Sequence, residues 1–183
     1  GKVQAVLFFS PTCGHCEYVI NELLLPVWFP QYGGEPEWSS AGAEGEEAAF
    51  YLATNGTLEV LLVNTGTEAG SQFYAMSAEA INLDQRGVPL LVYQDGYLIG
   101  SGDIPEQFPG IIEEGLASGG LDWPDLPGIQ EILAAITADP TTTTTTAEET
   151  TTVPHAGTTT SMPATTTTTS AVTTTTQGVL PIG

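Results

Sequence analysis

The most informative part of the sequence is Val3-Gln4-Ala5-Val6-Leu7-Phe8-Phe9-Ser10-Pro11-Thr12-Cys13-Gly14-His15-Cys16. Its opening residues are apolar and β-prone except for Gln4, and such a run predicts a buried strand. A Cys-x-x-Cys motif follows the strand after a short turn. A helix limited by Pro26 and Pro30 is predicted next, because apolar residues recur at helical spacing: Tyr18, Val19, Ile20, Leu23, Leu24 and Val27.

Strands and helices alternate along the rest of residues 1–140. A buried strand is expected over Leu58–Val63, and Pro89–Tyr93 with Tyr97–Ser101 is expected to form a hairpin. Helical crossovers join parallel strands and the hairpin adds an antiparallel edge, so the predicted class is α/β, with a central mixed sheet flanked by helices. The other expected elements are a loop over residues 31–45, a short helix over Glu46–Ala53, a helix over Ser71–Leu83 with Phe73, Met76 and Ile81 inward, a helix over Phe108–Ala117 and a last helix over Pro127–Ala138.

The charge of the chain excludes one class of partner. Of 183 residues, 22 are acidic and only Lys2 and Arg86 are basic, which gives a net charge of −20. A chain without a basic patch cannot neutralise phosphates, so no nucleic-acid partner is expected. It also lacks the cationic clusters that bind anionic membrane surfaces.

Residues 141–183 have a different composition from the rest. Thr makes up 21 of these 43 residues, and the segment contains no aromatic residue. Such a segment cannot bury enough apolar surface to offset its ordering entropy, so a disordered Thr/Pro-rich stalk or linker is expected there. Both an O-glycosylated stalk and an unmodified linker are consistent with the composition. No run of about 20 apolar residues is present, so no membrane span is expected in this segment.

Cys13 and Cys16 have the spacing of a thiol–disulfide catalyst. Two intervening residues place the sulfurs about one helical turn apart, with Cys13 just before the helix and Cys16 more buried. Free N–H groups at the helix start favour the Cys13 thiolate, so Cys13 is the expected nucleophile and Cys16 the resolving thiol. His15 adds a donor or partial positive charge near Cys13, which favours the reduced form and makes the disulfide more oxidising. No cofactor is expected beyond a redox-active Cys13–Cys16 disulfide.

Interpretations of the cysteine pair other than redox catalysis remain open. The pair could be half of a zinc site, but the only other His is His155 and there is no other Cys. It could form a purely structural disulfide, although a bridge closing so short a loop constrains little chain. His15 could also be a bystander within the motif.

The segment from Val6 to Cys16, together with Gly87-Val88-Pro89, resembles the thioredoxin superfamily over about residues 3–117. Cys13-Gly14-His15-Cys16 is similar to protein disulfide isomerase active sites, and Val88 before Pro89 looks like the Dsb-type oxidants. The resemblance implies a thioredoxin-like fold in a domain over residues 1–140, with an insertion at about 28–57 and an extra C-terminal helix at 127–138. It implies that Pro89 is a cis proline facing the cysteines and that the Val88 backbone pairs with substrate.

A narrower resemblance is to the thioredoxin-like domains linked to bacterial vitamin K epoxide reductase homologues. It depends on three segments: Ser10-Pro11-Thr12-Cys13 with Asn21-Glu22, Ile104-Pro105-Glu106-Gln107-Phe108-Pro109-Gly110, and Leu121-Asp122-Trp123-Pro124. It implies a membrane, quinone-linked disulfide-generating enzyme as redox partner. The chain departs from the superfamily at Leu7, where a buried carboxylate is common, and at Glu17, where disulfide isomerases carry Lys. The Glu17 charge opposes thiolate formation at Cys13.

Three functions follow as expectations. The first is a thiol–disulfide oxidoreductase acting on client proteins outside the cytoplasm, tethered to a membrane or wall as part of a longer protein. The second is a stalk-mounted protein- or peptide-binding module with an inert disulfide, suggested by the stalk and by a loop around Trp38. The third is a copper carrier that uses both thiolates. The direction of redox flow is open.

Overall fold

A computed structural model describes residues 1–138 of the chain. Six strands form one mixed sheet in the spatial order β2-β3-β4-β1-β5-β6. The strands are β1 (Val3–Phe9), β2 (Glu37–Glu44), β3 (Glu47–Thr54), β4 (Leu58–Asn64), β5 (Leu90–Tyr93) and β6 (Gly96–Ile99). The helices are α1 (Gly14–Glu17), the π-helix η1 (Tyr18–Trp28), α2 (Phe29–Tyr32), α3 (Glu68–Ala80), α4 (Gly100–Ser118) and α5 (Ile129–Ala138).

Strand β1 lies inside the sheet, as its apolar run predicts. It pairs in parallel with β4, from Val3 opposite Leu58 to Phe9 opposite Asn64, and antiparallel with β5. Almost every side chain of β1 and β4 is buried, because helices cover both faces of the sheet. Strands β5 and β6 form the expected hairpin. The mixed sheet flanked by helices is confirmed in these residues.

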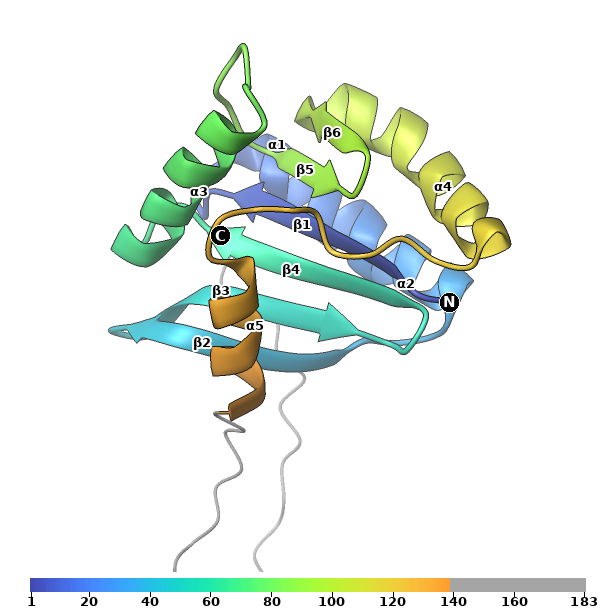
Figure 1. The fold of residues 1–183 in the computed structure, drawn as a ribbon, viewed down its shortest axis with the longest axis horizontal. Coiled ribbons are helices and arrows are strands. Elements are labelled where there is room, and N and C mark those ends of the chain that lie inside the picture. Colours follow the sequence, from blue (N-terminus) through green and yellow to red (C-terminus); the bar gives the residue numbers. More distant parts are fainter. Residues whose placement is uncertain (139–183) are drawn as a thin grey trace, which may run out of the picture. The chain divides into compact units, whose positions relative to one another are not determined.

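Helices α3 and α5 lie over one face of the sheet, and the helices from α1 to α2 lie over the other face together with α4 (Figure 1). On the α3 side, the Phe73 ring lies 5.6 Å from Phe8 and 6.0 Å from Phe50. On the opposite side, Trp28 meets Phe108 of α4 edge to face at 5.5 Å. The Phe73 contacts fix α3 to β1 and β3, and the Trp28–Phe108 contact joins η1 to α4 within the opposite layer.

The helix after the cysteines is longer than predicted. It continues through Pro26 and Pro30 to Tyr32, so the expectation that these prolines limit it was wrong. Between Tyr18 and Trp28 the backbone is a π-helix, and the Phe29 N–H donates to the Leu24 carbonyl five residues back. This wider register accommodates Pro26, which would break a tighter α-helix. Burial of Leu24, Trp28 and Phe29 holds the segment in place.

The residues inserted after this helix fold as a hairpin. The loop expected over residues 31–45 contains strand β2, and the helix expected over Glu46–Ala53 is strand β3, so both predictions were wrong. The register places Ala41 opposite Phe50 and Trp38 opposite Ala53. Trp38 is therefore a half-buried strand residue, not part of a loop. Pairing of β3 with β4 overrides the weak local preference for helix in this Glu- and Ala-rich stretch.

The remaining helices match the predictions with shifted boundaries. Helix α3 begins at Glu68, where the Thr67 side chain accepts the Gly70 N–H, and Met76 is 47 % exposed rather than inward. Helix α4 begins at Gly100, eight residues before the prediction, and contains two prolines. Burial of Ile104 and Phe108 in its first half supports this longer helix. The last helix, α5, begins two residues later than predicted.

The predicted Thr-rich stalk over residues 141–183 lies outside the described residues. Within residues 1–138, no helix combines the length and the apolar character that crossing a bilayer requires.

Candidate active site

Cys13 occupies the N-cap of the helix that follows β1. Its backbone is extended, with φ −99° and ψ 110°, and its carbonyl accepts hydrogen bonds from the N–H groups of Cys16 and Glu17 at 3.0 Å. The Cys13 N–H donates to the Ser10 carbonyl at 3.1 Å, which closes the turn after the strand. This geometry leaves Cys13 partly exposed at the helix start, in agreement with the predicted order of strand, cysteine and helix.

Cys16 lies one turn further on, and its side chain is fully buried. Both cysteines are free thiols. The pKa of the Cys16 thiol is raised to about 12, mainly by burial: a backbone hydrogen bond from Ser10 lowers it in part, and the neighbouring Cys13 contributes to the rise. The two sulfurs therefore differ in exposure, with Cys13 accessible to a client and Cys16 buried, as a nucleophilic and a resolving thiol require.

The loop that carries Val88 and Pro89 faces Cys13. The Val88–Pro89 peptide bond is cis, and Pro89 is buried. The Cys13 Sγ lies 3.8 Å from the Val88 carbonyl oxygen, within the range of a weak sulfur hydrogen bond. The structure thus brings together residues 75 positions apart in the chain, as the resemblance implied.

His15 lies exposed on the helix next to the cysteines, and its ring is held from a second helix. Its Nδ1 is 2.9 Å from the Ser101 Oγ near the start of α4. Ser101 was missed by the sequence analysis, because nothing in its neighbourhood marks it as part of a site. The bond fixes the orientation of the His15 ring. Gly14 borders open space, so it does not need to be glycine for packing.

Tyr74 of α3 is a second residue that the sequence analysis missed. Its hydroxyl accepts the Gly87 N–H at 2.8 Å and donates to the Gly87 carbonyl at 3.0 Å. Beyond the loop, the Pro89 carbonyl accepts the Gly100 N–H at 2.8 Å. The segment that faces Cys13 is therefore tied at both ends, to α3 and to the start of α4.

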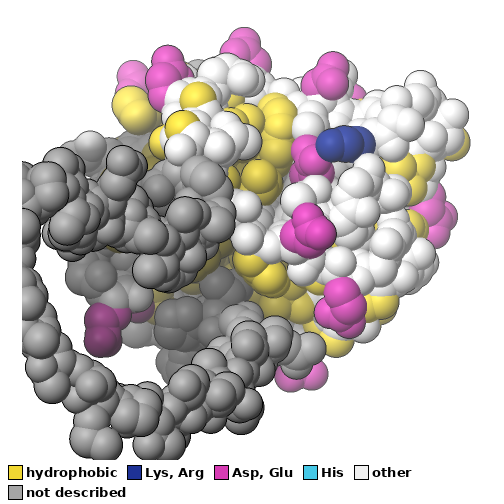
Figure 2. All heavy atoms as spheres, turned by 90° about the horizontal axis from the view of Figure 1, so that it is seen from below, with side chains coloured by type: hydrophobic (Ala, Val, Ile, Leu, Met, Phe, Trp, Pro, Cys, Tyr) yellow, Lys and Arg dark blue, Asp and Glu magenta, His cyan; other side chains and the backbone are white. Residues whose placement is uncertain are grey.

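Few charged groups lie next to the cysteines in the chain. Glu17 is exposed directly after Cys16, and the hydrophobic Leu7 is buried in β1. Acidic side chains are distributed over the face seen in Figure 2, among apolar and uncharged ones and beside one basic side chain. Lys2 is bound to Glu59 at 2.7 Å. Among the described residues, no group of three or more His, Cys, Asp or Glu is arranged to hold a metal ion.

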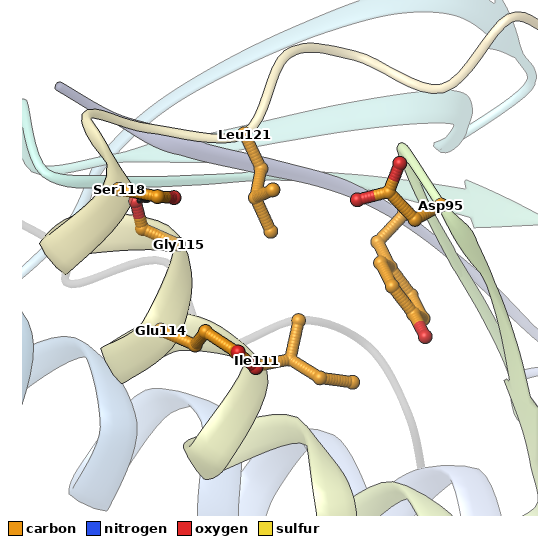
Figure 3. Close-up of a pocket in the computed structure, with 7 residues that line it drawn as sticks. Asp95, Ile111, Glu114, Gly115, Ser118 and Leu121 are labelled. Carbon is orange, nitrogen blue, oxygen red and sulfur yellow. Dashed lines mark hydrogen bonds between the residues drawn. The ribbon is translucent and has the colours of Figure 1, made fainter.

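A separate hollow of about 380 Å³ lies between α4 and the turn of the β5–β6 hairpin. Asp95 and Glu114 come from these two different elements and line opposite walls (Figure 3). None of its lining residues belongs to the cysteine site: they are Tyr93, Asp95, Ile111, Glu114, Gly115, Ser118 and Leu121.

Comparisons of the chain with protein-family models, with curated proteins and with solved structures found no match, so these comparisons assign no family.

Proposed function

We propose that this chain is a thiol–disulfide oxidoreductase with a thioredoxin-like fold. The observation that carries the proposal is the asymmetry of the cysteine pair: Cys13 is partly exposed at a helix start, and Cys16 is buried one turn later. The Val88 carbonyl, 3.8 Å from Cys13, provides a backbone group beside the reacting sulfur. An inert structural bridge requires neither the difference in exposure nor this backbone group.

The order of the elements supports the fold assignment. Without the β2–β3 hairpin, the chain runs strand, Cys pair, helix, strand, helix, hairpin and helix. This is the order on which the resemblance to the thioredoxin superfamily depends. The hairpin adds two strands beside β4 and leaves the pairing of β1 with β4 and β5 intact.

The reaction is an exchange of two electrons between two dithiol–disulfide pairs. In the reducing direction, the Cys13 thiolate attacks one sulfur of a client disulfide, the client S–S bond breaks, and a client thiolate leaves. Cys16 then loses its proton and attacks the Cys13 sulfur. The Cys13–Cys16 disulfide forms, and the second client sulfur leaves as a thiolate. The client is thereby reduced by two electrons, the protein is oxidised by two, and the reverse sequence oxidises a client dithiol.

The high pKa of Cys16 has a consequence for this sequence. A thiol with a pKa of about 12 is almost entirely protonated near neutral pH, so the mixed disulfide must transfer a proton from Cys16 before it resolves. Because Leu7 takes the place of a carboxylate, we propose that solvent or the client removes this proton.

The cellular setting is part of the same proposal. Disulfides persist in oxidising compartments, so we place the domain outside the cytoplasm, with the Thr-rich segment as a tether. The clients are proteins with thiols or disulfides, and the partner that reoxidises the domain is a membrane, quinone-linked disulfide-generating enzyme.

Trapping of the mixed disulfide tests the proposal. Cys16→Ala removes the resolving thiol, so Cys13 should remain bonded to a disulfide-bonded peptide, and the adduct should be visible by mass spectrometry and lost on reduction. Cys13→Ser should form no adduct. If Cys16→Ala forms no adduct and Cys13→Ser leaves partner binding intact, the chain is a binding module with an inert cysteine pair.

A further inference from the structure

We propose that Tyr74 is a positioning residue, whose hydroxyl holds the Gly87-Val88-Pro89 loop in place to present a client disulfide to Cys13. This inference rests on the proposed function and names one residue that determines how well the site engages a peptide. Tyr74 contacts no reacting atom, because it acts through the loop.

The geometry is that of a two-point clamp. One hydroxyl satisfies both backbone groups of Gly87, since it accepts the N–H at 2.8 Å and donates to the carbonyl at 3.0 Å. A hydroxyl with one donor and two acceptor lone pairs can make both bonds at once. Gly87 directly precedes Val88, whose carbonyl lies 3.8 Å from the Cys13 sulfur. A shift of Gly87 is therefore transmitted to the group beside the nucleophile through one peptide unit.

The two ends of the loop are held differently. After Pro89, a backbone bond from Gly100 at 2.8 Å ties the loop to the start of α4, and this bond involves no side chain. Before Val88, the Tyr74 hydroxyl, 13 residues away in the chain, is hydrogen-bonded to Gly87. The end next to Val88 is therefore held by a replaceable side-chain hydroxyl, in addition to the packing of the Val88 side chain against the core.

The Tyr74 ring is anchored independently of its hydroxyl. It packs edge to face on Phe8 of β1, with ring centroids 5.3 Å apart. Phe8 is fully buried. Replacement by Phe keeps this ring contact and removes only the hydroxyl, so Tyr74→Phe isolates the clamp from the packing.

The test compares two reagents that react at the same sulfur. The rate at which the full chain, fully reduced, exchanges with a disulfide-bonded peptide depends on the loop. The rate at which Cys13 reacts with iodoacetamide depends on the thiolate fraction and exposure of the sulfur and needs no docked peptide. Tyr74→Phe is expected to lower the peptide rate about tenfold, as displaced reacting groups do, and to change the iodoacetamide rate less than twofold.

Tyr51→Phe is the matched control. The Tyr51 hydroxyl also accepts a backbone N–H, from Ala48 at 3.0 Å, but it lies on β3, which is separated from β1 by β4. Its loss should leave both rates unchanged. Amide hydrogen exchange of Gly87 reports the clamp directly and should be faster in Tyr74→Phe only.

Each outcome decides the question. A slow peptide rate with a normal iodoacetamide rate supports positioning by Tyr74. Normal rates with fast Gly87 exchange overturn the inference and leave the proposed function standing. Equal slowing with both reagents also overturns it, because the sulfur itself is then altered. A wild-type chain that alkylates at Cys13 but never exchanges with a peptide disulfide overturns the proposed function, and positioning with it.

Discussion

The turn after β1 and the β2–β3 hairpin are held together in opposite ways. Around the Cys-x-x-Cys motif, single contacts come from separate segments: the Val88 carbonyl lies beside Cys13, and Ser101 at the start of α4 lies beside His15. The hairpin is a continuous ladder that pairs Glu37 with Thr54 at one end and Glu44 with Glu47 at the other. In the first region a substitution can change reactivity with little loss of stability. In the second, it should change stability without affecting reactivity.

The largest expected effect is the difference between the two thiols. Cys16 is fully buried with a pKa of about 12, so only about one molecule in 10⁴ carries its thiolate at pH 8. Cys13 is partly exposed. We expect iodoacetamide to modify Cys13 at least about 100-fold faster than Cys16, measured by peptide mapping of the reduced protein.

The single-cysteine variants provide the control for this measurement. Cys13→Ser should leave a chain that iodoacetamide hardly modifies until the chain is unfolded. Similar rates at the two cysteines in the folded wild type would contradict the assignment of nucleophile and resolving thiol.

A smaller effect is expected at His15. A donor beside Cys13 favours the reduced form, so His15→Ala should make the reduction potential more negative, by about 30 mV for a tenfold change in the equilibrium constant. Ser101→Ala should shift the potential in the same direction by less, since it only frees the ring. The two effects should not add, because both act through one group. Equilibration with glutathione buffers measures each potential.

Ser118→Ala is the matched substitution for this series. The Ser118 hydroxyl donates to the Gly115 carbonyl at 3.0 Å near the far end of the same helix. The reduction potential of Ser118→Ala should equal that of the wild type. An unchanged potential in His15→Ala would show that the histidine is a bystander.

The two regions also differ in how far their sequences predict them. The apolar run from Val3 to Phe9 is buried on both sides, so its composition alone predicts a strand, and the Cys-x-x-Cys spacing predicts the helix start. The hairpin is rich in Glu and Ala, with few large apolar side chains, and its strands form because β4 offers a partner. The intrinsic secondary-structure preference of these residues does not reflect their pairing with β4.

Local sequence patterns also predict only part of the cysteine site. Cys13, Cys16, His15, Val88 and Pro89 were found from two short motifs, and the structure brings them to one end of β1. Tyr74 makes two hydrogen bonds to a residue 13 positions away, and Ser101 makes one to a residue 86 positions away. No spacing rule connects such pairs, so only the fold reveals them.

The smallest expected effect lies at the tip of the hairpin and tests the contrast from its other side. The Glu44 carboxylate accepts the N–H groups of Glu68 and Ala69, at 2.9 and 3.0 Å, at the start of α3. The Ala69 bond, and then the Glu68 bond, lower the pKa of Glu44 below its ordinary value.

A carboxyl with a lower pKa in the folded state stabilises the fold above its unfolded pKa, and this contribution is lost as the pH falls through its folded pKa. Glu44→Gln should therefore lower Tm by about 2 °C at pH 7, and this difference should shrink as the pH falls through the folded pKa of Glu44. Glu46→Gln, which removes the same charge two residues away, should change Tm less at pH 7, and peptide exchange at Cys13 should be unaffected in both variants. A slower exchange in Glu44→Gln would show that the hairpin is coupled to the cysteines through α3, on which Tyr74 lies, and would remove the separation between the two regions.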